Sequence, residues 1–270
     1  MKIYIFVNKK ETQIIMRHGD FTELAKFYVD RPGYSMTILS YIKNNLVADL
    51  QRELTVADVG AGTGKLTECL ENIGLRGMAV EPNDAMREEG IKAFADRRTF
   101  TWSKGTAEET GLESDSVDWL LMGSSFHWAD AERASKEFKR VLKKGSVFTA
   151  IWNPRDIKRS KLHMEIEDMI NKEIPGMKRV SSGGTVTTEI MQDRLGGVFF
   201  PNLIYMECNH EEVMTKERYM NIWRSVNDIR VQAGEERFEK ILHKIENIIK
   251  SEEQIVVPYK SRAWTAVVNK

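Results

Sequence analysis

The feature that most constrains this sequence is a cluster of three glycines directly after a short apolar segment. Residues 55–59 (TVADV) precede Gly60, Gly62 and Gly64, and apolar residues then recur at helical spacing. Because glycine lacks a Cβ atom, it tolerates positive φ and lets the backbone approach a ligand closely. In an open α/β sheet, ligands bind at the turns that follow the carboxyl ends of the strands. The pattern therefore predicts a strand, a ligand-binding turn and a helix.

Strand-like and helix-like segments go on alternating up to about residue 155. A helix is expected from Ala131 to Leu142, closed by a turn at Lys143-Lys144-Gly145, and two helices are expected between Phe21 and Leu50. The segments expected to form strands are TVADVG, MAVEPN, FTWSKG, SVDWLLMG and SVFTAIW. Strands that alternate with helices form a parallel sheet with helices on both faces. We therefore expect an α/β fold, a doubly wound Rossmann-like sheet of seven mostly parallel strands with a helical cap.

The regular alternation of predicted strands and helices ends after Pro154, which suggests how the chain is divided. We expect an N-terminal extension (1–20), a cofactor-binding core (21–155), a helical cap insertion that includes one sheet strand (156–253) and a closing strand (254–270). The later helices are expected at 160–173, 185–196 and 215–250, and the two later strands in FFPNLIYMEC and QIVVPYKSRAWTAVVN.

Charge and cysteine content restrict the partners. The 40 basic and 40 acidic residues cancel, so there is no global field to attract nucleic acid or an anionic membrane, and a small-molecule partner is expected. Two cysteines, Cys69 and Cys208, cannot form a disulfide framework and do not indicate a metal site. With no signal peptide and no apolar segment near the ~20 residues of a membrane span, we expect a cytoplasmic monomer or homodimer.

The spacing of the loop discriminates between nucleotide-like ligands. A dinucleotide fingerprint is G-x-G-x-x-G, whereas here the third glycine comes one residue early and Lys65 occupies a position that needs a small residue. The spacing of Gly60 and Gly64 and the absence of a hydroxyl residue after Lys65 also argue against a phosphate-binding loop for ATP. Asp58 would repel a pyrophosphate but attract an ammonium group. A ligand with a zwitterionic or cationic head is therefore expected.

A second carboxylate follows the second expected strand. Glu81 comes 21 residues after Gly60, at a position where a carboxylate can accept hydrogen bonds from both ribose hydroxyls. A solvated glutamate in a loop would be the default interpretation of such a residue alone. Together with the glycine loop, Glu81 favours a ligand that contains a ribose.

At this point the sequence resembles the class I S-adenosylmethionine-dependent methyltransferases, and within them a small-molecule group similar to the trans-aconitate methyltransferases. Roughly residues 21–155 carry the resemblance, in the segments FYVDRPGYS, VADVGAGTGKLT, AVEPNDAM and GTAEETGLESDSVDWLLMGSSFHW. The resemblance implies S-adenosylmethionine as the cofactor, whereas the acceptor depends on the variable cap.

The resemblance also implies roles for individual positions. Asp58, Gly60 and Gly62 would hold the methionine end of the cofactor and Glu81 the ribose. Asn83, Met86, Ala107 and Glu108 would surround the adenine, Gly123 and Ser124 the sulfonium, and Tyr28 and Arg31 would lie over the cofactor. With the neighbouring loop positions, the expected cofactor-binding residues are Tyr28, Arg31, Asp58, Gly60, Ala61, Gly62, Thr63, Gly64, Glu81, Pro82, Asn83, Met86, Thr106, Ala107, Glu108, Gly123, Ser124 and Phe126.

Methyl transfer is an in-line displacement, so positioning and exclusion of water can supply most of the acceleration. A base is needed only for a protonated acceptor, and His127 is the candidate because an imidazole titrates near neutral pH. The alternative is that His127 and Trp128 are a structural pair, or that His127 only orients a carboxylate acceptor. Trp128, Trp152, Tyr219 and Trp223 are candidate substrate-pocket residues, although aromatic residues at helical spacing are more often core packing.

The sequence leaves three functions open. The first is methylation of a carboxylate, hydroxyl or amine of a small metabolite. The second is a non-catalytic protein that binds S-adenosylmethionine. The third, disfavoured by the glycine spacing and by Asp58, is an NAD-dependent oxidoreductase.

Overall fold

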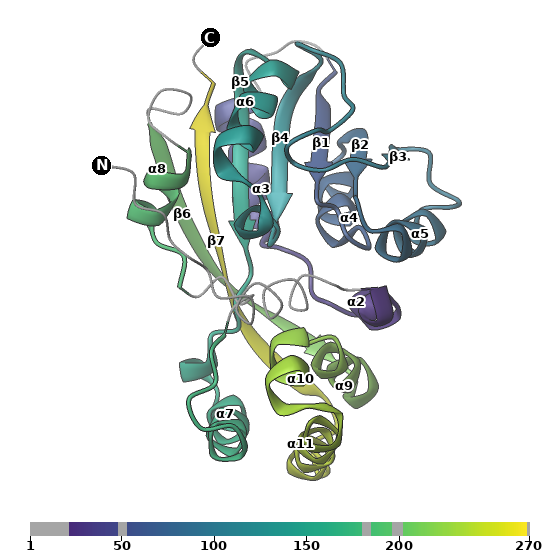
Figure 1. The fold of residues 1–270 in the computed structure, drawn as a ribbon, viewed down its shortest axis with the longest axis vertical. Helices are drawn as coiled ribbons and strands as arrows, with labels where there is room; N and C mark the ends of the chain where they lie inside the picture. Colours follow the sequence, from purple (N-terminus) through teal and green to yellow (C-terminus); the bar gives the residue numbers. More distant parts are fainter. Residues whose placement is uncertain (1–21, 48–52, 180–184, 196–201, 269–270) are drawn as a thin grey trace, which may run out of the picture.

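A seven-stranded sheet forms the centre of the computed structural model, which describes residues 22–47, 53–179, 185–195 and 202–268 (Figure 1). The strand order is β3-β2-β1-β4-β5-β7-β6. Strands β1 to β5 are parallel, and β7 is antiparallel to both of its neighbours, β5 and β6. The strands are β1 (Thr55–Val59), β2 (Arg76–Val80), β3 (Phe100–Ser103), β4 (Val117–Gly123), β5 (Leu142–Trp152), β6 (Leu203–Met214) and β7 (Ile255–Val267). The expectation of a mostly parallel seven-stranded sheet is confirmed.

Helices cover both faces of the sheet, and its central strands are mostly apolar and buried along most of their length. In β4, Leu120 and Met122 pack in the cluster that includes Phe138 of α6 (Ala131–Val141). Trp119 and Leu121 point to the opposite cluster, which contains residues of α3 (Met36–Ile42) and α4 (Lys65–Asn72). Burial on both faces is the reason that these strands appear as continuous hydrophobic runs.

The cap lies at the far end of the long β6–β7 hairpin, below the sheet in Figure 1. Its helices are α7 (Lys161–Glu173), α9 (Lys216–Arg224), α10 (Asn227–Ala233) and α11 (Glu235–Ile248). They form a core of their own, to which the lower part of the hairpin also contributes. Helix α8 (Thr188–Leu195) packs instead on the sheet, where Trp264 Nε1 donates to Thr188 Oγ1 at 3.0 Å. The hairpin therefore connects the two hydrophobic cores.

The remaining elements are short. They are α2 (Ala25–Tyr28), α5 (Asp84–Ala93), a π-helical turn (Lys43–Val47) and three 3₁₀ turns (Thr22–Leu24, Phe126–Trp128 and Ile157–Arg159). Within the described part of the chain, no helix is long and apolar enough to cross a membrane. The N-terminal extension expected at residues 1–20 lies outside the described residues.

Two local expectations are wrong. The turn expected at Lys143-Lys144-Gly145 lies inside β5, which begins directly after α6. Gly145 has φ +75°, and the register of β5 against β4 shifts nearby, so the glycine marks an irregularity in the strand. The single helix expected over 215–250 is three helices, α9 to α11, with the last break at Gly234, whose φ is also +75°.

Candidate active site

One cavity of about 610 Å³ extends from the carboxyl ends of β1, β2 and β4 to the cap. All of the expected cofactor-binding residues except Gly64 and Phe126 line it. Those brought together are Tyr28, Arg31, Asp58, Gly60, Ala61, Gly62, Thr63, Glu81, Pro82, Asn83, Met86, Thr106, Ala107, Glu108, Gly123 and Ser124. Positions spread over nearly 100 residues of sequence thus converge, because parallel strands present their carboxyl ends at the same edge.

The glycine loop forms one wall of this cavity and depends on the absence of side chains. Gly60 and Gly62 have φ of +71° and +60°, in the left-handed region. A Cβ atom on Gly60 would lie 2.7 Å from Ser125 Oγ. Gly64, in contrast, lies under the aromatic rings of Phe94 and Trp102, which explains why it is a packing residue and does not line the cavity.

Asp58 provides a buried carboxylate at the head of the loop. Its side chain is fully buried, Oδ2 accepts a hydrogen bond from Thr67 Oγ1 at 2.6 Å, and Oδ1 has no partner among the described residues. Burial, assisted by the nearby charge of Glu81, raises the pKa of Asp58 to about 7. Asp58 lines the cavity, and an unpaired buried carboxylate oxygen is unfavourable unless a donor binds to it. This position fits the ammonium group of a methionine moiety.

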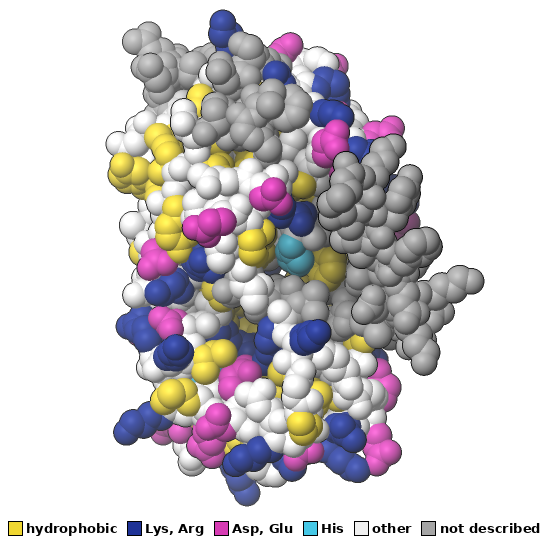
Figure 2. Space-filling view, turned by 60° about the vertical axis from the view of Figure 1, so that its left-hand side comes forward, with side chains coloured by type: hydrophobic (Ala, Val, Ile, Leu, Met, Phe, Trp, Pro, Cys, Tyr) yellow, Lys and Arg dark blue, Asp and Glu magenta, His cyan; other side chains and the backbone are white. Residues whose placement is uncertain are grey.

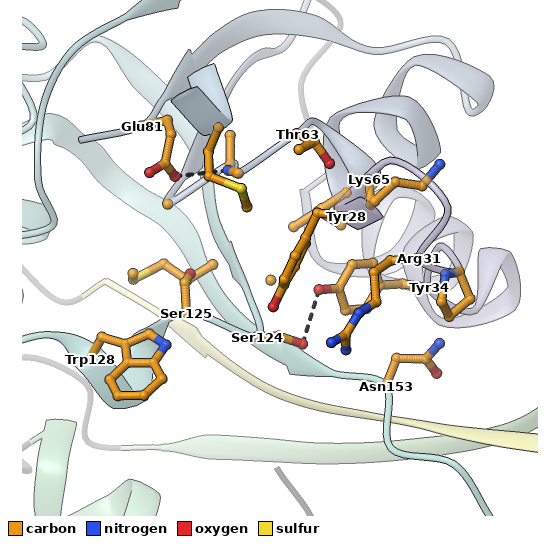
Figure 3. Close-up of a pocket in the computed structure, with 18 of the residues that line it drawn as sticks. Tyr28, Arg31, Tyr34, Thr63, Lys65, Glu81, Ser124, Ser125, Trp128 and Asn153 are labelled. Carbon is orange, nitrogen blue, oxygen red and sulfur yellow. Dashed lines mark hydrogen bonds between the residues drawn. The ribbon is translucent and has the colours of Figure 1, made fainter. Parts of the chain in front are cut away.

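Glu81 follows β2, and two backbone hydrogen bonds hold its buried side chain in a fixed orientation (Figure 3). Its Oε2 accepts from the Gly62 N–H and its Oε1 from the Asn83 N–H, both at 2.8 Å. Burial raises the pKa of Glu81, and the two backbone donors oppose that increase. Each carboxylate oxygen can accept a second hydrogen bond, so two ribose hydroxyls fit the remaining positions.

The expected adenine end is built around the start of α5. Asn83 Oδ1 accepts from the Met86 N–H at 3.0 Å and thereby caps the helix. Met86 is buried, and its Cε would lie 3.2 Å from a Cβ atom on Gly62. Across the cavity, Glu108 Oε1 accepts from the Asp130 N–H at 2.7 Å, which ties the loop after β3 to the start of α6. The resulting wall is apolar in the middle and polar at its edges.

Tyr28 and Arg31 approach the cavity from the segment before β1. The Arg31 guanidinium lies 4.6 Å from the centre of the Tyr28 ring. Arg31 Nε and Nη2 donate to Ser225 Oγ and Ser225 O at 2.6 and 2.9 Å. Because Ser225 follows α9, Arg31 connects the cofactor side of the cavity to the cap.

Tyr34 is a site residue that the sequence analysis did not single out. Its hydroxyl lies 3.0 Å from Ser124 Oγ, and burial raises the pKa of Tyr34 well above its usual range (Figure 3). Ser124 has φ +52°, an unusual value for a residue with a side chain. The sequence could have indicated Tyr34 as a site residue, because it belongs to the FYVDRPGYS segment that contains Tyr28 and Arg31.

His127, the expected base, does not line the cavity. Its Nδ1 accepts from Trp152 Nε1 at 3.3 Å, which places the imidazole proton on Nε2, and Nε2 is buried without a partner. Burial, assisted by the charge of Arg194, lowers the pKa of His127 to about 4. The imidazole is therefore neutral at pH 7 and points into protein, as in the alternative structural interpretation.

Of the four aromatic residues expected in the substrate pocket, only Trp128 lines the cavity. Trp152, Tyr219 and Trp223 are almost completely buried: Trp152 packs under the sheet, and the other two pack in the cap core. The acceptor end is lined by charged and polar side chains that sequence reasoning missed, among them Asn153, Arg155, Glu167, Arg179, Asp228 and Tyr259. They come from separate segments, so no local motif could have identified them.

Residues 57–150 match the family described as a methyltransferase domain. The chain is 38% identical over 126 residues to an uncharacterised methyltransferase of Mycobacterium tuberculosis, covering 47% of this chain and 48% of that protein. It is 26% identical over 238 residues to an uncharacterised methyltransferase of Schizosaccharomyces pombe, and this match covers 85% of this chain and 86% of that protein. The chain thus spans about half the length of the first of these relatives.

A solved structure has the same fold. The protein from Anaeromyxobacter dehalogenans, provisionally described as a type II methyltransferase, superposes with a TM-score of 0.61 at 21% identity, covering 88% of this chain and 97% of that one. The family match identifies residues 57–150 as a methyltransferase domain, and the shared fold and the site geometry agree with an S-adenosylmethionine-dependent one. The cofactor is S-adenosylmethionine, and the unpaired Asp58 Oδ1 and the oriented Glu81 fit its ammonium and ribose.

Proposed function

We propose that this chain transfers the methyl group of S-adenosylmethionine to a small-molecule acceptor by in-line displacement. The observation that carries the proposal is the buried, unpaired Oδ1 of Asp58, which lines the cavity beside a loop that leaves room for backbone contact. The acceptor would be a carboxylate, hydroxyl or amine, and the resemblance to the trans-aconitate methyltransferases favours an organic acid. We also propose a cytoplasmic monomer or homodimer.

When bound, S-adenosylmethionine supplies a methyl group whose bond electrons return to sulfur while a lone pair of the acceptor forms the new bond. The residues of this chain would position and desolvate that reaction. Asp58 and Glu81 orient the two ends, while Tyr28 and Arg31 cover the site and exclude water. Gly123 lets the Tyr34 hydroxyl approach the end of β4, because a Cβ atom on Gly123 would lie 2.7 Å from it, and Ser124 would border the methyl group.

The residues that line the cavity also indicate which chemical class of acceptor fits the site. Among the described residues that line it there is no histidine or cysteine, and Arg179 pairs with both Glu167 and Asp228. A carboxylate acceptor is already ionised and needs no base. A hydroxyl or amine would have to lose its proton to water or to one of these paired carboxylates. An acidic acceptor is therefore the simplest substrate for this site.

The overall charge pattern is consistent with a small-molecule acceptor. Basic and acidic side chains are intermixed over the face drawn in Figure 2, with no extended area of one sign. A nucleic-acid substrate would require a concentrated basic surface. We therefore propose no nucleic-acid or membrane partner.

The first test is calorimetric titration of the protein with S-adenosylhomocysteine, with NADH and ATP as controls and Asp58→Asn as the comparison variant. Saturable binding that Asp58→Asn weakens is expected, and absence of binding to the folded protein would overturn the proposal. The second test is transfer from methyl-labelled S-adenosylmethionine to pools of acids, alcohols and amines. Binding without transfer to any pool would favour the non-catalytic alternative.

A further inference from the structure

The cap end of the cavity contains an arginine without a carboxylate partner. Arg155 follows β5, lines the cavity, and forms an isolated backbone bridge with Tyr259 of β7. Its guanidinium lies 3.9 Å from the centre of the Trp223 ring. Among the described residues, no ion pair links Arg155 to a carboxylate, and the nearby Glu167 pairs with Arg179 at 2.5 Å. Arg155 is therefore a desolvated cation whose charge the cap leaves unpaired.

Several polar groups around Arg155 also lack partners. The hydroxyls of Tyr219 and Tyr259, Trp223 Nε1 and His163 Nε2 are all buried without a hydrogen bond in the described structure. The rings of His163 and Tyr219 are 5.7 Å apart, and those of Tyr219 and Trp223 are 6.1 Å apart, so the groups are contiguous. All four groups can donate a hydrogen bond. Of the four residues, Tyr259 lines the cavity together with Arg155, so its hydroxyl is the buried unmet donor that an acceptor oxygen of a ligand can reach.

Of the other two arginines that line this end of the cavity, only Arg179 contacts carboxylates. Arg179 contacts Glu167 and Asp228, and Arg31 is held by Ser225 on the cofactor side. Both carboxylates at this end contact Arg179, and Arg31 lies on the cofactor side, so Arg155 is the arginine at the cap end that has no carboxylate partner among the described residues. Apolar side chains complete the wall, namely Ile157, Ile222 and Val226. The chemistry therefore matches a ligand with an apolar body and one anionic group.

We propose that Arg155 and Tyr259 form an anchor for an anionic oxygen group of the acceptor, distinct from the atom that receives the methyl group. The single uncompensated charge favours a carboxylate, and a phosphate monoester has the same oxygen chemistry. Arg155 and Tyr259 contact the ligand from the cavity wall. Tyr219, Trp223 and His163 do not line the cavity, and Trp223, whose ring stacks against the guanidinium, holds Arg155 in position. Recognition of this group selects the substrate. The inference rests on the proposed methyltransferase function.

The test uses ligands that differ only in charge, titrated into protein saturated with S-adenosylhomocysteine. The probes are hexanoate with hexanamide and phenylacetate with phenylacetamide, and phenyl phosphate is the phosphate probe. We expect at least one acid to bind about tenfold more tightly than its amide, because a charged hydrogen bond contributes roughly 1.5–3 kcal/mol. Tighter binding of phenyl phosphate than of phenylacetate would assign the anchor to phosphate. If neither the acids nor phenyl phosphate bind more tightly than the amides, the anchor does not exist.

Two variants and one control make the assignment specific. Arg155→Met should abolish the preference for the anion, and Tyr259→Phe, which removes only the hydroxyl, should reduce it severalfold. Arg159→Met is the control, because Arg159 is half exposed, pairs with Glu211 and does not line the cavity. Equal loss in Arg159→Met, or an unchanged preference in Arg155→Met, would overturn the inference. Titration of each variant with S-adenosylhomocysteine alone reports separately on the cofactor site and on folding.

Discussion

Glu81 Oε2 accepts a hydrogen bond from the Gly62 N–H at 2.8 Å, which ties the end of β2 to the glycine loop after β1. The other oxygen accepts from the Asn83 N–H. One carboxylate therefore fixes the loop and the start of α5, and still faces the cavity. In the proposed function, ribose binding and loop geometry would depend on the same side chain.

Replacing Glu81 should accordingly weaken the cofactor site more than loss of one contact would suggest. Glu81→Gln keeps the shape but substitutes a donor for one acceptor oxygen, and Glu81→Ala removes both. We expect about tenfold weaker binding of S-adenosylhomocysteine for Glu81→Gln and about a hundredfold for Glu81→Ala, since each lost hydrogen bond to a charged group costs roughly 1.5–3 kcal/mol. Calorimetric titration measures both. Glu88→Gln, on the exposed side of α5, is the control and should bind normally. Normal binding by Glu81→Ala would contradict the assignment.

The buried Asp58 predicts an unusual dependence of stability on pH. Its folded pKa of about 7 exceeds the value of about 4 expected after unfolding, so between these values the folded state binds the extra proton. The contribution of Asp58 to the free energy of unfolding therefore falls as pH rises from about 4 to about 7. Chemical denaturation of the ligand-free protein across this range, compared with Asp58→Asn, isolates the effect. A difference between the two proteins that does not vary with pH would refute it.

Cofactor affinity should follow the opposite trend. Only the ionised Asp58 attracts an ammonium group, so S-adenosylhomocysteine should bind up to tenfold more weakly for each unit of pH below about 7. In Asp58→Asn the affinity should be lower and nearly independent of pH over the same range. Titration at pH 5.5, 6.5 and 7.5 provides the comparison.

The sequence predicted the cofactor half of the cavity because its residues lie in short continuous segments. Asp58, Gly60 and Gly62 are adjacent in the loop, and Glu81 ends the next strand, so sequence spacing translates directly into position at the sheet edge. Gly64 was expected to bind the cofactor because it lies next to Gly62 in the motif. Instead, its missing side chain makes room for Phe94 and Trp102.

The acceptor half could not be predicted in the same way. Arg155 and Tyr259 are about 100 residues apart and meet only because β7 returns beside β5. His127 was expected to face the methyl group because it follows Ser124, but the 3₁₀ turn at Phe126–Trp128 directs its ring toward Trp152. Such orientations depend on tertiary packing, which a local pattern does not contain.

Substitution of Gly60 tests whether the loop needs glycine for its positive φ or for the lack of space beside it. Gly60→Ala would place a Cβ atom at φ +71° and 2.7 Å from Ser125 Oγ, whereas Gly111→Ala has a similar φ of +72° and open space. We expect both to lose roughly 1–2 kcal/mol in the free energy of unfolding from the left-handed conformation. Only Gly60→Ala should also weaken binding of S-adenosylhomocysteine. Denaturant unfolding and calorimetry measure the two effects, and equal cofactor affinity in both variants would show that the loop accommodates a side chain.

Tyr34 should control the geometry next to the transferred methyl group. Because its raised pKa keeps the hydroxyl protonated at neutral pH, it can donate to Ser124 Oγ, 3.0 Å away, and so help to hold Ser124 at φ +52°. Tyr34→Phe removes that hydrogen bond without changing the ring. We expect a loss of about 1 kcal/mol in the free energy of unfolding and severalfold weaker binding of S-adenosylhomocysteine.

Tyr41→Phe is the matched control for this change, because Tyr41 is 55% exposed on α3 and does not line the cavity. It should leave both quantities unchanged. If Tyr34→Phe behaves like Tyr41→Phe, then the backbone hydrogen bond from the Ser124 N–H to the Ile151 carbonyl, 2.8 Å long, is sufficient to hold the turn. If only Tyr34→Phe is impaired, the phenol is a positioning group for the serine that borders the methyl site.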